Sequence, residues 1–342
     1  MKPILVTIPS IRTPIMRSPG FEKKELATHK LDVMGLCGFG CLYCSSSAGN
    51  YLRINRGKFL EMTREQTGQD LLPSTSPELS FRWGDFEGRL DAQLATKRAD
   101  GSWGKGGTLV CSQLTDMFSP WAVAEGLTLR TLKKVLLRTS FRLRLLTKSA
   151  SVANAEFLDL MRAHPDRFVV GLSIGTLDDG WASRVEIGTS PPSARVRALH
   201  KLQDAGVKTF GMLCPVFPDV LDKDGVERLV EAIRPERCET VWSEPYNDRN
   251  NWKHVAAGYL DERAKGFIAR MFSGDDARIN WSQYAGHLYD RVHAALGGES
   301  GKHRYLLYQG GLVDFEKERL RDMPGVLFQS DETEKTEPTD AV

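Results

Sequence analysis

The sequence lacks any apolar run close to the roughly 20 residues that an α-helix needs to span a bilayer, so no membrane-spanning helix is expected. It also has little net charge, +2 from 46 basic and 44 acidic residues, and so does not indicate a strongly charged partner. No targeting segment is evident, because the apolar start of the chain, 1–15, is interrupted by Pro3, Pro9 and Pro14. These absences predict a cytoplasmic protein whose thiols stay reduced.

Cysteine is sparse, with 6 in 342 residues, but three stand close together: Cys37, Cys41 and Cys44. Their spacing is C-x3-C-x2-C, just after the short apolar segment 29–34. Thiolates are the soft ligands that iron–sulfur clusters take. Three thiolates on a four-iron cluster leave one iron open, so the spacing favours a cluster that takes part in chemistry rather than one that only stores electrons.

The sequence also allows two other uses of these cysteines. A structural zinc site normally has four ligands in two closely spaced pairs, and the remaining cysteines, Cys111, Cys214 and Cys238, form no second pair. His29 could serve as a fourth zinc ligand. Disulfides are disfavoured because no signal peptide precedes the cysteines.

Short apolar strands alternate with amphipathic helices along most of the chain, and the apolar fraction of 41% is enough to bury a core. Strands are expected at 30–35, 107–112, 142–147, 168–174, 208–214 and 240–243, and helices at 63–72, 127–138, 152–163, 193–205 and 225–233. This alternation is typical of parallel β–α units. A partial barrel and a doubly wound open sheet would both produce it.

The cysteine run, with aromatic Tyr43 before its last cysteine, resembles the cluster loop of the radical S-adenosylmethionine (SAM) superfamily. The resemblance implies a 4Fe–4S cluster on Cys37, Cys41 and Cys44, with SAM as a second cofactor chelated by the open iron. In this family, electron transfer from the cluster cleaves SAM and releases a 5′-deoxyadenosyl radical. The resemblance further implies a partial (β/α)6 TIM-like barrel of parallel strands, and an external one-electron donor of the flavodoxin or ferredoxin type.

Residues 107–220 resemble more narrowly the spore photoproduct lyase-like branch of this superfamily, the relatives of DNA repair photolyases. The matching segments, in the order of the family, are 112–116, 146–148, 171–174, 184–189 and 214–218. Each lies at a strand end or in the loop after it, where parallel barrels carry their chemistry. With the cysteine loop, the resemblance covers roughly residues 29–245.

The chain is accordingly divided into four segments. They are an N-terminal extension (1–28), the partial barrel (29–245) with an insertion at about 84–106, a C-terminal helical or mixed extension (246–329) and an acidic tail expected to be disordered (330–342). The insertion is expected to be a long loop, either a lid or a solvated surface segment.

The resemblance assigns SAM-binding roles to residues of the matching segments. They are Thr115 and Asp116 near the methionine and ribose, Lys148 at the carboxylate, Ser173 as a polar contact, Tyr43 and Cys214 near adenine, and Arg184 lining the site. A carboxylate such as Asp116 can accept hydrogen bonds from a ribose hydroxyl or an ammonium. Arg184 and Glu186 would equally suit a surface ion pair.

The chain also departs from this branch. The hydrogen-donating cysteine of the lyase, three residues before the matching aspartate, is Gln113 here, and the tyrosine after the third cluster cysteine is Ser45. The thymine-dimer reaction therefore does not follow from the resemblance. Cys111 would face the same side of a strand as Gln113 and is the candidate catalytic thiol, the alternative being an ordinary buried cysteine.

The substrate is less well indicated. The basic stretches 53–58, 130–144 and 162–167, with aromatic residues such as Trp242, would suit the phosphates and bases of a nucleic acid. Acidic neighbours make solvated helix faces an alternative reading of these stretches. Two other functions stay open at this point: a radical SAM enzyme that modifies a peptide or protein, and a non-catalytic metal-binding module.

Overall fold

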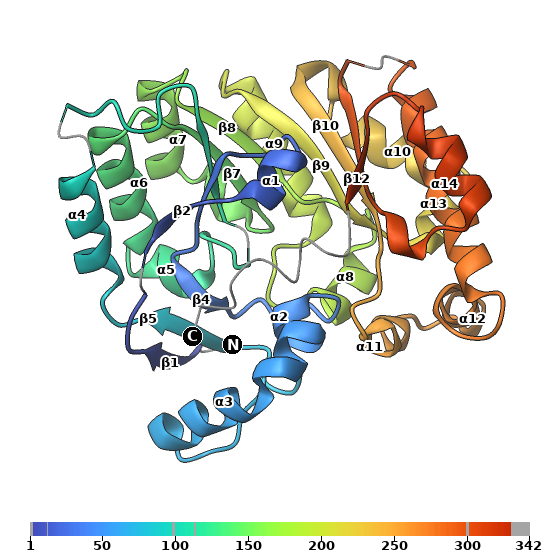
Figure 1. The fold of residues 1–342 in the computed structure, drawn as a ribbon, viewed down its shortest axis with the longest axis horizontal. Coiled ribbons are helices and arrows are strands. Elements are labelled where there is room, and N and C mark those ends of the chain that lie inside the picture. The colour runs from blue at the N-terminus through green and yellow to red at the C-terminus, as the bar shows by residue number, and fades with distance from the viewer. Residues whose placement is uncertain (1–2, 12, 98–99, 113, 299–300, 330–342) are drawn as a thin grey trace.

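The computed structural model describes residues 3–11, 13–97, 100–112, 114–298 and 301–329. Its main feature is a curved sheet of nine strands (Figure 1). In spatial order the strands are β12 (Val326–Gln329), β11 (His303–Tyr308), β10 (Cys238–Pro245), β9 (Thr209–Val216), β8 (Phe168–Leu172), β7 (Arg142–Thr147), β6 (Thr108–Cys111), β3 (His29–Leu31) and β2 (Ile15–Arg17). In this sheet all strands except β2 run parallel to one another, and β2 pairs antiparallel with β3. The sheet is open between β12 and β2.

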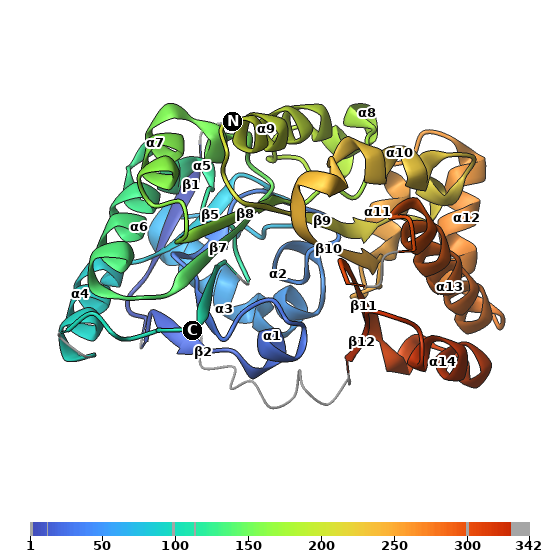
Figure 2. The ribbon, with the colours of Figure 1, turned by 90° about the horizontal axis from the view of Figure 1, so that it is seen from above.

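Helices cover the convex, outer face of this sheet (Figure 2). They are α4 (Phe86–Thr96), α6 (Leu127–Arg138), α7 (Ala155–Ala163), α9 (Pro192–Asp204), α10 (Gly225–Ala232), α13 (Ala277–Ala295) and α14 (Asp314–Arg321). In α6, Leu132, Val135 and Leu136 recur at helical spacing and are buried. Helices on one face distinguish a partial TIM-like barrel, as predicted, from a doubly wound sheet, which has helices on both faces.

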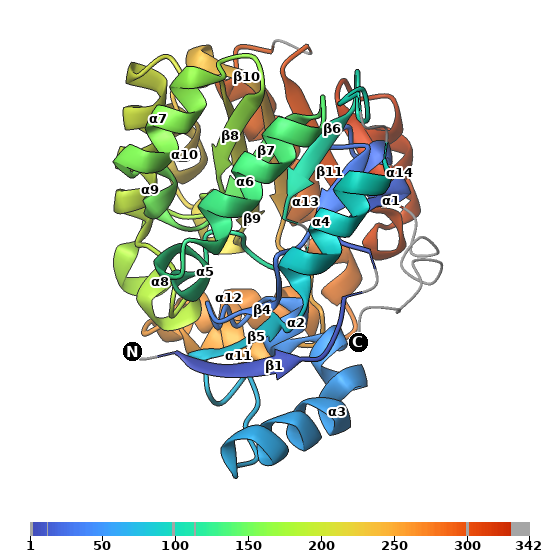
Figure 3. The ribbon, with the colours of Figure 1, turned by 90° about the vertical axis from the view of Figure 1, so that its left-hand side faces the viewer.

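A second, smaller sheet carries the cysteine loop. It consists of β1 (Ile4–Ile8), β5 (Leu79–Trp83) and β4 (Met34–Cys37), with β1 parallel and β4 antiparallel to β5. After the cysteines come the short helix α2 (Ser45–Ala48) and the long helix α3 (Asn50–Thr67). Helix α3 projects away from the barrel beyond the small sheet (Figure 3). The short helices α5 (Pro120–Ala124), α8 (Asp179–Val185), α11 (Trp252–Ala257) and α12 (Glu262–Phe272) complete the α-helical connections.

The N-terminal segment fills the concave, inner face of the large sheet with α1 (Pro19–Lys23) and Leu26. Leu26 packs there against Phe210 and Trp242, which point inward from β9 and β10. The indole N–H of Trp242 donates to the Lys24 carbonyl at 3.1 Å, and the buried Arg144 guanidinium donates to the Leu26 carbonyl. The segment from α1 to Leu26 is therefore part of the barrel interior.

Three local expectations from the sequence are wrong. The strand expected at 30–35 is divided between β3 and β4, with Asp32 between them accepting the Leu114 N–H at 2.9 Å. The helix expected at 63–72 is the end of α3, where Thr63 lies inside the helix rather than capping it. The insertion expected as a long loop contains α4, whose Phe86, Leu90 and Leu94 are buried at spacings of four residues.

The C-terminal segment 246–329 extends the same sheet. Its strands β11 and β12 pair parallel with β10 and with each other, so the parallel strands from β3 onward number eight rather than the six expected. The proposed division into four segments stays a prediction, and residues 330–342 lie outside the described part of the chain. Among the helices described, none combines the length and apolar character needed to cross a bilayer.

Candidate functional site

The three cysteines lie on a tight turn between β4 and α2. Gly38 and Gly40 take left-handed backbone conformations, with φ of +69° and +58°. A Cβ at Gly40 would lie 2.8 Å from the Pro77 Cα, so only glycine fits there. Cys37, Cys41 and Cys44 are free thiols, of which Cys41 is buried and the others half-buried.

The segment that follows α8 holds this cysteine loop in place. The Leu42 N–H donates to the Val185 carbonyl, and the Gly188 N–H donates to the Phe39 carbonyl, each at 2.8 Å. Cys41 and Glu186 form a single antiparallel bridge between these two hydrogen bonds. The sequence stretch 184–189, singled out by resemblance, is thus a backbone clamp on the cysteines.

The pKa values of the Cys37 and Cys41 thiols are raised by burial and by neighbouring charged groups. Burial, together with the nearby Cys44 and Asp116, raises the pKa of Cys37 to about 12, while backbone N–H groups of Phe39 and Asp116 donate to its sulfur. Burial and the Glu186 carboxylate raise the pKa of Cys41 well above its usual value, and the Lys148 ammonium opposes that rise. The uncharged thiol is therefore favoured at Cys37 and Cys41, and a metal centre would displace their protons.

No three His, Cys, Asp or Glu side chains in the described ranges are placed to bind a single metal ion. An iron–sulfur cluster makes a different demand, because each cysteine binds a different iron atom and the sulfurs are spread around the cluster. The distances among the three cysteine sulfurs should therefore be compared with those around a cluster, and not with those around a single metal ion.

Asp116, the expected SAM ligand after β6, is engaged within the protein. Its carboxylate accepts the Thr147 hydroxyl at 2.8 Å, the Lys148 N–H at 2.8 Å and the Phe118 N–H at 2.9 Å. Burial raises its pKa despite these hydrogen bonds. Asp116 therefore ties the loop after β6 to the end of β7. Thr115 behaves similarly, since its hydroxyl donates to the Met34 carbonyl at 3.2 Å.

Lys148, Ser173, Tyr43 and the backbone of Cys214, all expected near SAM, lie together in the structure. The Lys148 ammonium donates to the Ser173 hydroxyl at 2.5 Å and lies 5.5 Å from the centre of the Tyr43 ring. The Ser173 hydroxyl in turn donates to the Cys214 carbonyl. These contacts join the ends of β7, β8 and β9 to the cysteine loop and leave a half-buried cation among them.

Glu186 and Arg195 form a buried ion pair beside this cation, with side-chain exposures of 4% and 0%. Arg195 also donates to the Ser173 carbonyl at 2.6 Å, and the Tyr43 hydroxyl donates to Glu186. Burial acts to raise the pKa of Glu186, but the charges of Arg195 and Lys148 and the Tyr43 hydrogen bond outweigh it, so the pKa is lowered. Glu186 is therefore a carboxylate that connects the cysteine loop to β8.

Neither the sequence pattern nor the resemblance predicts a role for Arg195. The signal was present, since Arg195 stands on the buried stripe of α9 with Ala198, Leu199 and Leu202, where a charged side chain needs a buried partner. The resemblance predicts Arg184 in the site instead. The Arg184 guanidinium donates to the Gly258 carbonyl at 2.6 Å, and neither an ion pair with Glu186 nor a contact with the Lys148 group is among its described contacts.

Cys111 does not lie with these residues. Its side chain is fully buried in the apolar layer that also contains Leu109, Leu143 and Leu145, on the helix-covered side of the sheet. Burial, together with nearby Asp32, raises its pKa. The expectation that Cys111 faces the cysteine loop is wrong in its placement, and Gln113, on which it was based, lies outside the described residues. Cys214, in contrast, faces the inner side, where its thiol donates to Glu244 at 3.1 Å.

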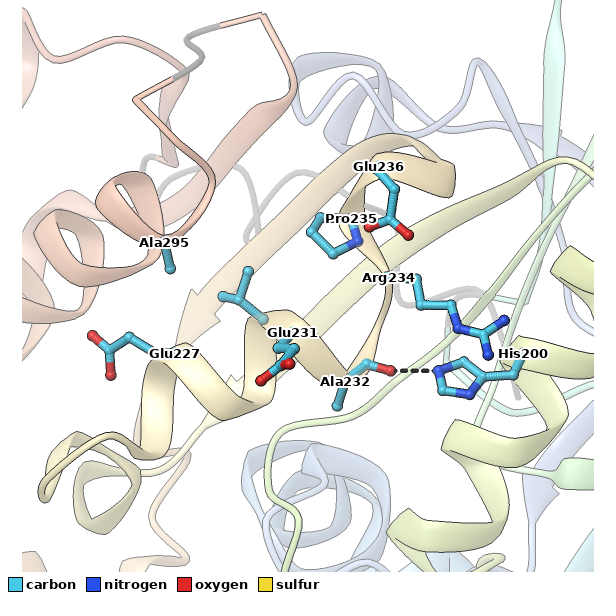
Figure 4. A pocket seen from close by; sticks show the side chains of 9 residues that line it. His200, Glu227, Glu231, Ala232, Arg234, Pro235, Glu236 and Ala295 are labelled. Atoms are coloured by element: carbon cyan, nitrogen blue, oxygen red, sulfur yellow. Dashed lines mark hydrogen bonds between the residues drawn. The ribbon is translucent and has the colours of Figure 1, made fainter.

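A surface cavity of about 810 Å³ lies at the opposite end of the strands (Figure 4). His200, Glu227, Glu231 and Arg234 line it, and the His200 ring is 2.8 Å from the Ala232 carbonyl. None of the predicted site residues lines this cavity. The chemistry-bearing side chains gather at the carboxyl ends of the strands, as in other parallel barrels.

Comparisons with known proteins agree with this arrangement at the level of the fold. No protein-family model matches the sequence. An uncharacterized protein of Acidianus two-tailed virus is 28% identical over 126 residues, which make up 36% of this chain and 42% of that protein. The match thus spans less than half of the relative's length.

Solved structures of spore photoproduct lyase share most of the architecture. A cysteine-to-serine mutant of that enzyme is 15% identical, with a TM-score of 0.52, and the match covers 88% of this chain and 81% of the lyase chain. A cysteine-to-alanine mutant with dinucleoside spore photoproduct matches with a TM-score of 0.50, at the same identity and coverage. The protein therefore has a fold like that of spore photoproduct lyase, and the predicted resemblance is confirmed for the fold.

Proposed function

We propose that this protein is a radical SAM enzyme that carries a 4Fe–4S cluster on Cys37, Cys41 and Cys44 and acts on a nucleic acid base. The observation that carries the proposal is the cysteine loop, with three free thiols held at the carboxyl ends of the strands in this particular fold. Soft sulfur donors with backbone N–H groups directed at one of them suit an iron–sulfur cluster.

When bound, the cluster would supply an electron and an open iron for SAM, from which the radical chemistry starts. The residues around it suit the binding of SAM. The Lys148 ammonium can pair with a carboxylate, Ser173 offers a hydroxyl, and Tyr43 offers an aromatic face. Asp116 and the Glu186–Arg195 pair act as positioning residues, because their hydrogen bonds hold the loops that present these groups.

The proposed substrate class is supported by the fold and by the lyase structure that contains a dinucleoside. An alternative radical SAM function on peptides would be favoured by a second cluster. Cys111, Cys214 and Cys238 give no support for one, because Cys111 and Cys238 are buried in the helix-covered layer whereas Cys214 faces the inner side. The electron is proposed to come from an external one-electron donor.

Iron and sulfide analysis of anaerobically purified protein tests the cluster without relying on activity. We expect about four iron and four sulfide per chain, and their loss in a variant with all three loop cysteines replaced by alanine. Cys238→Ala is the matched control, because Cys238 is buried near Gln203 and Thr209 and should leave the iron content unchanged. Zinc in place of iron, or iron retained by the triple variant, would contradict the proposal.

A further inference from the structure

The N-terminal half of α3 presents an exposed basic surface. Between residues 33 and 60 the chain has three basic residues, Arg53, Arg56 and Lys58, and no acidic residue. Arg53 and Arg56 are exposed one turn apart on α3, and Arg56, four residues after Leu52 and three before Phe59, lies at the edge of the buried stripe of the helix. Arg53 contacts Asn50 at 3.4 Å, and neither arginine has a carboxylate partner within the described residues.

This charge is poorly placed for the stability of the helix itself. The positive end of a helix dipole disfavours nearby cations, and α3 has no acidic residue in its first turn, where the uncharged Ser45 hydroxyl accepts the Tyr51 N–H at 3.1 Å. Gly57, between the basic residues, weakens the helix further, and a Cβ there would meet no atom within 4 Å. Exposed Ile54, with 71% of its surface accessible, lies beside it. Within the described residues, the fold therefore does not account for the surface made by residues 53–57.

The position of this surface matters because of the adjoining cysteine loop. Helix α3 starts six residues after Cys44, and Arg56 lies about 9 Å along the helix from its first residue, at 1.5 Å per residue. On its other side the cysteine loop contacts the Glu186 and Lys148 group at the strand ends, where a substrate would bind. An electron carrier that approached along α3 would reach the loop without occupying the substrate side.

The small size of the surface favours a redox protein over a nucleic acid. Two or three cations are few for a duplex, since DNA-binding proteins commonly neutralise about six to ten phosphates. Transient electron-transfer complexes, in contrast, have small interfaces, typically under about 1,200 Å², and complementary charge sets their association rate.

We propose that residues 53–57 of α3 form the docking surface for an acidic one-electron carrier of the flavodoxin class. This inference rests on the proposed function, because the electron passes from the reduced flavin to a cluster on the neighbouring loop. One electron is transferred, so that the flavin is oxidised by one electron and the cluster is reduced by one, and no atom moves between the partners.

The test compares two reductants of the same protein, reduced flavodoxin and dithionite, by stopped-flow absorbance of the cluster. The variant Arg53→Glu/Arg56→Glu should slow reduction by flavodoxin about tenfold or more at low ionic strength, the scale of electrostatic steering, and leave dithionite reduction unchanged. The control Arg138→Glu/Arg162→Glu makes the same charge change at exposed positions of α6 and α7 and should leave both rates unchanged. Gly57→Trp should slow reduction of the cluster by flavodoxin because its bulky side chain hinders docking, whereas Gly57→Ala should leave this rate unchanged.

Binding of oxidised flavodoxin, measured by titration calorimetry at low salt, tests docking even if no cluster assembles. Loss of binding in the double variant but not in the control supports the surface. Unchanged binding and unchanged flavodoxin rates would overturn it, as would equal slowing with both reductants. A double variant that loses DNA affinity but keeps its flavodoxin rate would reassign the surface to nucleic acid. A wild-type protein that binds flavodoxin through α3 yet holds no iron would instead contradict the proposed function.

Discussion

The ion pairs at the two ends of the strands differ in how far they are buried. At the carboxyl ends, the Glu186 and Arg195 side chains are buried and hydrogen-bonded to each other. At the amino ends, Asp204 pairs with Arg234 and Arg237, and all three side chains are between 34% and 56% exposed. Exposed pairs contribute under about 1 kcal/mol, whereas burying ions costs several kcal/mol that a partner only partly offsets. Buried charge at the carboxyl ends is thus poorly explained by stability alone and is consistent with a role in positioning the cysteine loop.

The largest expected effect comes from removing one member of the buried pair. Arg195→Met should lower the free energy of unfolding by about 3–5 kcal/mol, because it leaves the Glu186 carboxylate buried without its cation. Arg234→Met, which breaks an exposed pair, should cost under about 1 kcal/mol. Urea denaturation of both variants measures the difference. Equal losses would show that the two ends do not differ as described.

Substitutions of Lys148 and Asp116 should have different main effects, the first on SAM affinity and the second on the free energy of unfolding. Lys148→Ala should weaken SAM binding by about 1–3 kcal/mol and leave the unfolding free energy nearly unchanged, because Lys148 is half-buried and the Ser173 hydroxyl to which its ammonium donates also bonds to the Cys214 carbonyl. Asp116→Ala should lower stability by a similar amount, since it leaves the Thr147 hydroxyl and two backbone N–H groups without their acceptor.

Calorimetric titration with SAM and denaturation of each variant provide the two readouts. Wild-type SAM affinity in the Lys148 variant would remove Lys148 from the site.

A buried histidine at the amino end should make stability depend on pH. Burial, with the neighbouring charges of His293 and Arg304, lowers the pKa of His303 to about 3. The unfolded chain takes up this proton near its usual pKa of about 6.5, so the folded state is favoured above that pH and loses about 2 kcal/mol by pH 5. His303→Gln should remove this part of the pH dependence in denaturation curves. An unchanged pH profile would show that His303 titrates normally.

Cys111 should behave as a core residue. Cys111→Ala should lower stability by about 1 kcal/mol, the usual cost of a small core truncation, and leave the iron content and the formation of 5′-deoxyadenosine unchanged. The measurement is product analysis by chromatography after reduction, beside a denaturation curve. Diverted or stalled product in this variant would restore Cys111 as a catalytic thiol.

The sequence predicted the barrel well where periodicity and length agree. Helix α6 and strand β7 have the bounds expected from their apolar spacing. The strand expected at 30–35 was wrong, because a short, mostly apolar segment does not show that the chain passes from one sheet to another at Asp32. Strands β11 and β12 were missed because the last part of the chain had no family pattern to follow.

At the candidate site, motif spacing indicated which backbone segments meet, but not which side chains face inward. Cys111 lies in the helix-covered layer and the Arg184 guanidinium donates to the Gly258 carbonyl, and both placements depend on tertiary packing. Arg195 was missed because its partner Glu186 is nine residues away on a different element. Short motifs predict which strand ends lie near one another. A buried ion pair between two elements can be identified only once the packing of those elements is known.

The central claim is that the three cysteines hold a cluster with an iron open to SAM, and electron paramagnetic resonance of the reduced protein tests it most directly. We predict the spectrum of a reduced 4Fe–4S cluster that changes when SAM is added, because the cofactor binds the iron that has no cysteine. A spectrum unaffected by SAM, or the absence of any cluster signal in protein reduced under anaerobic conditions, would contradict the claim.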